Sequence, residues 1–289
     1  MPRAVSIHIG VNQPRNPDGY PLLKHSESTA GRMAELAGRA GYHSTLVLRG
    51  EAATRRAVHQ ALAGASQALV RGDTLFVSFS GHGAQVRDRD GDEREGADEA
   101  WCLYDGHLLD DKLAGYWRLF ERGVRIVVVV ESCYSAGSCR AGDLPRMRWM
   151  PSPAAVVAVP AASAAAAMPN LRNGRSRGPE PVRGVEATSS CIAEPPRDVY
   201  QIRASVLLLA ASREDRTAAD GLFTRCLLQV WDEGFTGSYC ELYAEVRQRV
   251  MAERPTQEPQ ILMLGAPDPT FPLAPAFRVG CAAATYRGA

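Results

Sequence analysis

Short apolar runs alternate with longer amphipathic segments along the first part of the chain. The runs have the composition of strands and lie at 4–11, 44–48, 74–80 and 124–131. The last run contains four consecutive valines, which suits a strand buried on both faces of a parallel sheet. Segments at 28–40, at 54–69 behind a capping Thr54, and after Asp110 have helical spacing. This alternation predicts an α/β fold with a mainly parallel sheet.

Composition divides the chain into two ordered blocks, a linker and a tail. The first block covers 1–137, although its polar stretch at 83–104 is expected to be a loop. Residues 138–203 are rich in Pro, Ala, Arg, Gly and Ser and have no period, which predicts a flexible linker. A second block at 204–275 has the pattern of two strands and two helices, and 276–289 are expected to be a tail.

Charge and cysteine content narrow the class of protein further. The formal net charge of +1 argues against nucleic acid as a partner. No apolar stretch reaches the roughly 20 residues of a membrane span, and no signal peptide is apparent at the N-terminus. The seven cysteines show neither disulfide nor zinc spacing, which favours a reducing compartment. We therefore expect a cytoplasmic protein that binds no membrane, and the sequence predicts no particular oligomer.

Candidate chemistry lies just past two of the predicted strands. His82 follows the strand that begins at Thr74, and Cys133 follows the valine-rich strand. Each is followed by small residues, and the carboxyl ends of parallel strands are the edge where ligands bind in open α/β sheets. A cysteine and a histidine brought to that edge would form a nucleophile and its base.

Two motifs carry a resemblance to a known family. Segment 79–83 reads Phe-Ser-Gly-His-Gly, and segment 131–137 reads Glu-Ser-Cys-Tyr-Ser-Ala-Gly. Both resemble the caspase–metacaspase clan of cysteine peptidases, and most of all its bacterial metacaspase-like members. Tyr134, where metacaspases usually have His, and the additional Ala136 depart from that pattern. The resemblance implies a caspase-like three-layer fold with about six strands, in which 1–137 and 204–275 match the large and small subunits.

The resemblance also assigns roles to the two residues. His82 would take the proton of the Cys133 thiol, and the backbone N–H groups of Gly83 and Cys133 would form the oxyanion hole. The implied function is a cysteine endopeptidase acting on protein or peptide substrates. No side chain that would orient His82 is apparent, but in this clan a backbone carbonyl often has that role. The alternatives are an inactive caspase-like scaffold or binding module, and another thiol enzyme such as an amidase.

Cleavage after Arg or Lys is implied by acidic residues that line the substrate pocket of metacaspases. Ser80 and Glu131 match two of the pocket positions. The third position, expected to be acidic, is Thr29, and Glu27 is the nearest candidate to compensate. A carboxylate at Glu131 would pair with a guanidinium. The alternative is that Glu131 is a strand-end carboxylate held by backbone N–H groups.

The resemblance to metacaspases also suggests calcium as a ligand. No cofactor is required for the chemistry, but many metacaspases are activated by calcium that acidic residues bind. Asp98 and the pair Asp110–Asp111 match the first two ligand positions, whereas the last falls near Arg140, with Asp143 displaced. The acidic stretch 88–99 also carries arginines, so a solvated polar loop is the alternative to a calcium site.

The predicted linker offers a substrate within the chain itself. It contains nine arginines and no lysine. A flexible segment tethered near an Arg-preferring active site would be present at high effective concentration. The sequence therefore predicts self-cleavage within 138–203, with two fragments that stay associated through one sheet. The alternative is that the linker is a spacer that is never cut.

Overall fold

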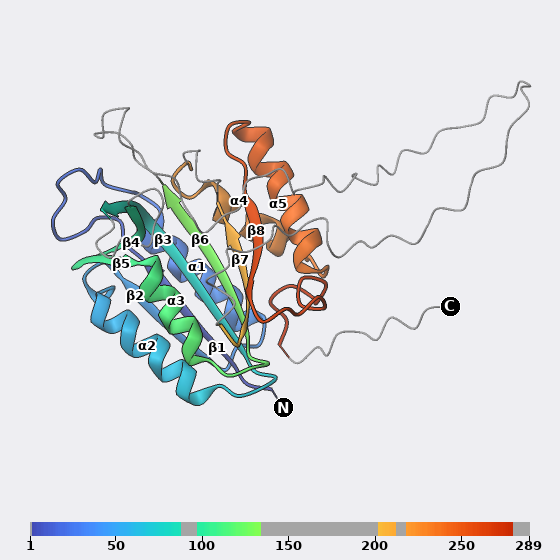
Figure 1. Cartoon of the computed structure of the whole chain (residues 1–289). Coiled ribbons are helices and arrows are strands. Elements are labelled where there is room, and N and C mark those ends of the chain that lie inside the picture. The colour runs from blue at the N-terminus through green and yellow to red at the C-terminus, as the bar shows by residue number, and fades with distance from the viewer. Residues whose placement is uncertain (1, 88–96, 134–201, 212–217, 280–289) are drawn as a thin grey trace, which may run out of the picture.

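A computed structural model describes residues 2–87, 97–133, 202–211 and 218–279, and its centre is one twisted sheet (Figure 1). Six strands form the main path in the order β2-β1-β3-β6-β7-β8. Their bounds are β1 (Ala4–Gly10), β2 (Ser44–Arg49), β3 (Thr74–Arg87), β6 (Arg125–Cys133), β7 (Ser205–Ala210) and β8 (Gln260–Gly265). All neighbours pair in parallel except β7 and β8, which are antiparallel. The predicted α/β class with a mainly parallel sheet is confirmed.

Helices cover both faces of the sheet and make the fold three layers deep. The helices are α1 (Ser26–Arg39), α2 (Arg55–Ala68), α3 (Asp110–Leu119), α4 (Leu222–Asp232) and α5 (Tyr239–Glu253), with a 3-10 turn at Gly50–Ala52. Leu62 of α2 and Trp117 of α3 pack against one face, in front of the sheet in Figure 1. Met33 of α1, Phe223 of α4 and Leu242 of α5 pack against the other face.

Local capping explains where two of these helices begin. The Thr54 side chain accepts a hydrogen bond from the Ala57 N–H at 3.1 Å, which confirms the predicted cap of α2. Ser238 and Glu241 form a capping box at the start of α5, each side chain accepting from the other residue's backbone N–H.

The region predicted as a polar loop at 83–104 is different in the structure. Strand β3 continues to Arg87 and pairs antiparallel with β4 (Ala97–Leu103), which in turn pairs with β5 (Gly106–Leu109). The Trp101 ring stacks on the Phe79 ring with centroids 4.6 Å apart, and Leu103 is fully buried. The many polar residues in this stretch hid these apolar anchors from a reading by composition.

The second block of the chain completes the sheet begun by the first. Residues Ser205–Ala210 of β7 pair in parallel with β6, so both sides of the predicted linker belong to one core. The packed region also extends beyond 275, where the tail was predicted to begin. Phe277 is fully buried, and its ring lies 4.8 Å from that of Phe76. Phe277 has no apolar periodicity around it in the sequence, so the pattern was too weak to show this packing in advance.

Candidate active site

The register of the sheet brings the two candidate catalytic positions together. Strands β3 and β6 are parallel neighbours, and His82 is the direct partner of Cys133. Ser80 is likewise paired with Glu131, two residues earlier. Neighbouring strands lie about 4.8 Å apart, so residues 51 positions apart in sequence become adjacent at one edge of the sheet.

A backbone carbonyl anchors the imidazole of His82. The ring is fully buried, and its Nε2 lies 2.7 Å from the carbonyl oxygen of Pro21. Because a carbonyl can only accept, Nε2 carries the proton in this contact, and in the neutral ring Nδ1 is then the basic nitrogen. The Tyr20 ring packs beside it, with centroids 5.3 Å apart. Sequence reasoning could not identify Pro21, because any residue supplies a carbonyl.

Burial and nearby groups act in opposite directions on His82. Burial lowers the pKa of the imidazole, whereas the Pro21 carbonyl and the negative charge of Asp220 raise it. The net pKa lies below the ordinary value of a histidine. The neutral imidazole, which is the form that can accept a proton, is therefore favoured near neutral pH.

Glu131 is held by the first turn of helix α4. Its Oε1 accepts from the Phe223 N–H at 2.9 Å, and its Oε2 accepts from the Thr224 N–H at 3.2 Å. The Thr224 hydroxyl donates to the same Oε2. The side chain is 1% exposed. These bonds match the alternative left open by the sequence, a carboxylate held by backbone N–H groups, and they connect β6 of the first block to α4 of the second.

The same burial shifts the titration of this carboxyl group. Loss of hydration raises the pKa of Glu131 to about 7, although the donors from Thr224 and Phe223 oppose the shift. The negative charge of Asp220 raises the pKa further. Glu131 is therefore a buried acid that titrates near neutral pH.

Two serine hydroxyls lie buried in this part of the structure without a partner. Ser80 is 2% exposed and Ser26 is fully buried, and neither Oγ has a hydrogen-bond partner among the described residues. A buried hydroxyl without a partner is costly, so a bound ligand or water is expected to satisfy it. Thr29 is also buried. The Glu27 N–H donates to Asn12 Oδ1 at 3.1 Å.

Asp220 is an acidic residue of this region that sequence reasoning did not select. It precedes helix α4, and its Oδ2 accepts from the Lys24 N–H at 2.7 Å. A cavity of about 120 Å³ between α1 and α4 is lined by His25, Ser28, Thr29, Arg32, Asp220, Gly221, Arg225 and Leu228. Asp220 stands next to the Gly221-Leu222-Phe223-Thr224 segment, and that closeness was the only available signal.

Two other cysteines in the described residues, Cys102 and Cys226, are poor candidates for a nucleophile. Burial raises the pKa of the Cys102 thiol to about 11, and it also raises that of Cys226. A thiol with a raised pKa holds its proton at neutral pH and reacts slowly. Cys139, Cys191 and Cys281 lie outside the described residues.

No group of three or more His, Cys, Asp or Glu side chains suited to a metal ion occurs within the described residues. The backbone of Asp98 lies in β4 and Asp110 begins α3, whereas Asp143 and the side chains of Asp98 and Asp111 fall outside the description. The described residues therefore do not form a calcium site. In the same part of the chain, no helix is long and apolar enough to cross a membrane.

Comparison with known proteins agrees with this arrangement. Residues 16–144 match the family described as metacaspase, peptidase C14 domain. Metacaspase-1B of Aspergillus terreus is 28% identical over 212 residues, which cover 65% of this chain and 54% of the relative. Metacaspase-1A of Neurospora crassa is 27% identical over 225 residues, covering 68% and 48%. The chain thus spans about half the length of these curated relatives.

A solved structure matches over nearly the whole chain. It is that of a protein from Geobacter sulfurreducens, with 27% identity and a TM-score of 0.69, covering 96% of this chain and 99% of the other. The sheet order and the paired His and Cys positions define a caspase-like α/β protein. Together with the family match over residues 16–144, they make the chain similar to the metacaspases of the caspase–metacaspase clan.

Proposed function

We propose that this protein is a cysteine endopeptidase in which His82 and Cys133 form the catalytic dyad. The observation that carries the proposal is the pairing of the two positions across β3 and β6, with the imidazole anchored by Pro21. The matches to metacaspases support the same activity. The alternative of an inactive scaffold predicts the same fold without turnover, so only a functional test separates the two.

The anchored imidazole suggests the order of proton transfers. With Nε2–H donated to Pro21, Nδ1 of His82 accepts the thiol proton as the Cys133 sulfur bonds to the substrate carbonyl carbon. Backbone N–H groups of Gly83 and Cys133 stabilise the resulting oxyanion. The imidazolium then protonates the departing amine as the C–N bond breaks. Water then attacks the thioester carbonyl carbon while His82 accepts its proton. The C–S bond breaks, the carboxylic acid product leaves, and the imidazolium returns its proton to the thiolate.

The proposed substrates carry Arg or Lys before the cleaved bond. Buried carboxyl and hydroxyl groups gather beside the dyad, and the hydroxyls of Ser80 and Ser26 lack partners in the described structure. A guanidinium or ammonium group would supply the missing donors. Glu131 matches a pocket position of the resembling family, but its oxygens already accept three hydrogen bonds.

The experiment that tests this function is turnover of fluorogenic peptides with Arg or Lys at the cleavage site. Cys133→Ala and His82→Ala are each expected to lower kcat/KM by about 10³-fold or more, because dyad members act as a unit. Circular dichroism and the melting temperature should stay close to wild type for Cys133→Ala. Cys102→Ala is the matched control and should retain turnover. Wild-type protein without turnover on any peptide, or an active Cys133→Ala variant, would refute the dyad.

Self-cleavage within 138–203 is a second part of the proposal. It rests on the arginines of that segment, which lies mostly outside the described residues. The pairing of β6 with β7 on either side of it would hold the fragments together. Purified wild type and Cys133→Ala should be incubated with and without calcium, and their termini read by mass spectrometry. Fragments ending in Arg only in wild type support self-cleavage and show whether calcium activates it, whereas an intact, fully active chain contradicts it.

We expect the protein to act in the cytoplasm, on protein or peptide substrates. The cysteine content and the absence of disulfide spacing support this location.

A further inference from the structure

Two carboxylates lie near the dyad, and their environments differ. Glu131 is 1% exposed, and its oxygens already receive the two N–H groups and one hydroxyl at the start of α4. A substrate cation would have to compete with three donors for a carboxylate that is already satisfied. Glu131 is therefore suited to fixing α4 against β6 and poorly suited to binding a new cation.

Asp220 has the opposite environment. It is half-buried, and the backbone N–H of Lys24 fixes its Oδ2. No other hydrogen bond to its carboxylate is found among the described residues, so Oδ1 keeps its capacity to accept. The negative charge of Asp220 raises the pKa of both His82 and Glu131, which places it within electrostatic reach of the dyad.

The cavity that Asp220 lines also contains Thr29, the position where an acid was expected and is missing. Helix α1 thus supplies a neutral side chain, and the segment before α4 supplies a carboxylate to the same cavity. In this arrangement Asp220, from the second block, takes the place of the acid that was expected at position 29 in the first block. Glu27, the compensating residue considered from sequence, is engaged with Asn12 and does not line this cavity.

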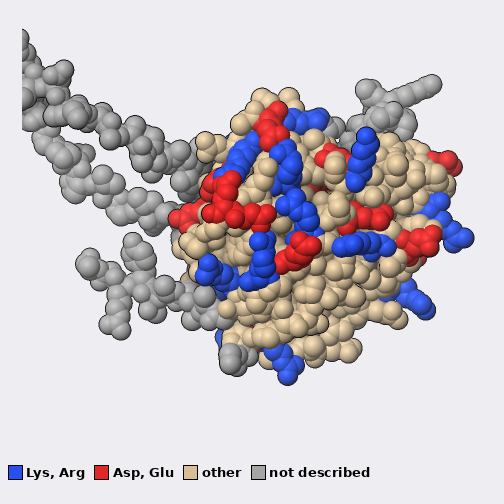
Figure 2. All heavy atoms as spheres, turned by 180° about the vertical axis from the view of Figure 1, so that it is seen from behind, with Lys and Arg blue, Asp and Glu red and all other residues tan. Residues whose placement is uncertain are grey.

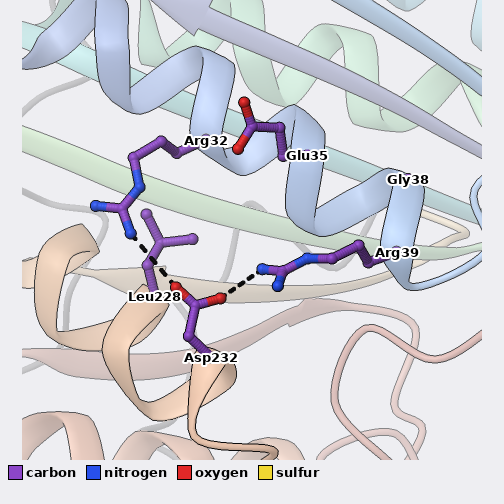
Figure 3. A pocket seen from close by; sticks show the side chains of 6 residues that line it. All are labelled: Arg32, Glu35, Gly38, Arg39, Leu228 and Asp232. Carbon is purple, nitrogen blue, oxygen red and sulfur yellow. Dashed lines mark hydrogen bonds and ion pairs between the residues drawn. The ribbon is translucent and has the colours of Figure 1, made fainter.

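The cations of the cavity are paired with other acids. Arg225 contacts Glu253 at 2.5 Å, and Arg32 contacts Asp232 at 3.5 Å, as the dashed line in Figure 3 shows. The side of the molecule that lies behind in Figure 1 carries interspersed positive and negative residues, with no large patch of one sign (Figure 2). Selection of a cation here would therefore depend on a local carboxylate and not on the overall field.

We infer that Asp220 is the carboxylate that selects a basic residue at the cleavage position, and that Glu131 positions α4. The inference rests on the proposed peptidase function. In this arrangement the substrate's guanidinium or ammonium donates to Oδ1 of Asp220 and to buried hydroxyls. Charge-assisted pairing of this kind discriminates strongly against neutral analogues, because an unpaired partially buried carboxylate is costly.

The test compares two peptides that differ only in charge, one with Arg and one with citrulline at the cleavage position. In wild type, kcat/KM should favour Arg, and Asp220→Asn should lower the Arg-to-citrulline ratio by about 10-fold or more. Glu131→Gln should lower kcat/KM for both peptides by similar factors and leave the ratio unchanged. Asp232→Asn, which removes a carboxylate of α4 that pairs with Arg32 and Arg39, is the matched control and should leave the ratio unchanged.

A binding measurement separates failure of this inference from failure of the proposed function. Tetrapeptides ending in arginine amide or citrulline amide are titrated by NMR into Cys133→Ala protein, with and without Asp220→Asn. Loss of the Arg preference on Asp220→Asn supports the inference, even if wild type proves to have no peptidase activity. A ratio that falls with Glu131→Gln but not with Asp220→Asn, or an equal loss for both peptides in Asp220→Asn, overturns it. Equal binding of both peptides to the parent protein also overturns it.

Discussion

The two faces of the central sheet differ in chemistry, although the same strands form both. Towards α2 and α3, strands β1, β3 and β6 present mainly apolar side chains such as Ile9, Phe79 and Val128. Towards α1, α4 and α5, the same strands carry the apolar residues Phe76, Val127 and Val129. On this face they also bury a series of polar residues. These residues are Ser6, His8, Ser78, Ser80, His82 and Glu131.

This difference shows how the fold separates stability from chemistry. Buried polar groups cost free energy unless they are hydrogen-bonded, so a sheet face that carries them needs a reason to keep them. The polar series ends at the strand edge where His82 and Cys133 meet. The apolar face supplies packing without that cost. Substitutions on the two faces should therefore have different consequences.

The largest effect on stability is expected on the apolar face. Trp117 of α3 is 2% exposed and packs in that cluster. Trp117→Ala should lower the free energy of unfolding by about 3–5 kcal/mol, because it leaves a large cavity. Urea unfolding followed by circular dichroism measures the change. Leu119→Ala, on the same helix but 50% exposed, is the control. A loss below about 1 kcal/mol for Trp117→Ala would contradict the proposal that the apolar face supplies most of the stability.

A smaller, pH-dependent effect is expected at His8 on the polar face. Its Nδ1 contacts the Ser78 hydroxyl at 2.8 Å, and burial lowers its pKa to about 3. Between these two pKa values, His8 is protonated in the unfolded chain but neutral in the folded protein. The free energy of unfolding therefore falls as the pH drops from about 6.5 towards 3. At pH 5 this amounts to about 2 kcal/mol.

His8→Gln should therefore reduce the loss of stability between pH 7 and pH 5, measured by urea unfolding at both values. His43→Gln, at an exposed position, is the control and should unfold like wild type at each pH. An undiminished pH dependence in His8→Gln would show that this buried histidine does not carry the linkage.

Titration of Glu131 should change the free energy of unfolding with pH in the opposite direction to titration of His8. Its pKa is raised from 4.5 to about 7, so its contribution to stability is present at pH below 4.5 and is lost as the pH rises through 7. Between pH 5 and pH 7.5 we expect a change of similar size to that of His8, about 2 kcal/mol. Glu131→Gln should make stability rise more steeply between pH 5 and pH 7.5. Glu35→Gln, at an exposed site on α1, is the control, and an unchanged or shallower slope in Glu131→Gln argues against the buried-acid account.

The sequence predicted those parts of the fold and site that local patterns encode. The valine run of β6, the helical spacing of α1 and α2, and the strand-end positions of His82 and Cys133 each follow from nearby residues. Contacts with no side-chain signature could not be predicted in this way. The Pro21 carbonyl is one example, and the seating of Glu131 on α4, a helix 91 residues further along the chain, is another.

The β4–β5 hairpin and Phe277 show a second limit of sequence reasoning. In both regions a few apolar residues pack against partners that are distant in sequence. Trp101 packs against Phe79. Phe277 packs against Tyr239, Phe76 and Trp231. Their immediate surroundings are polar or rich in proline, so composition predicted a loop and a tail. Such segments acquire their structure from tertiary packing, which overrides local propensity.

Covalent labelling of the nucleophile tests the central claim most directly. Wild-type protein is treated with a peptidyl chloromethyl ketone that ends in Arg, and the modified residue is identified by peptide mass spectrometry. We expect one adduct, on Cys133, and we expect it to form about 100-fold more slowly in His82→Ala, because the thiol then lacks its base. Cys226→Ala should be labelled like wild type. An adduct on another cysteine, or labelling of Cys133 at an equal rate without His82, would contradict the dyad.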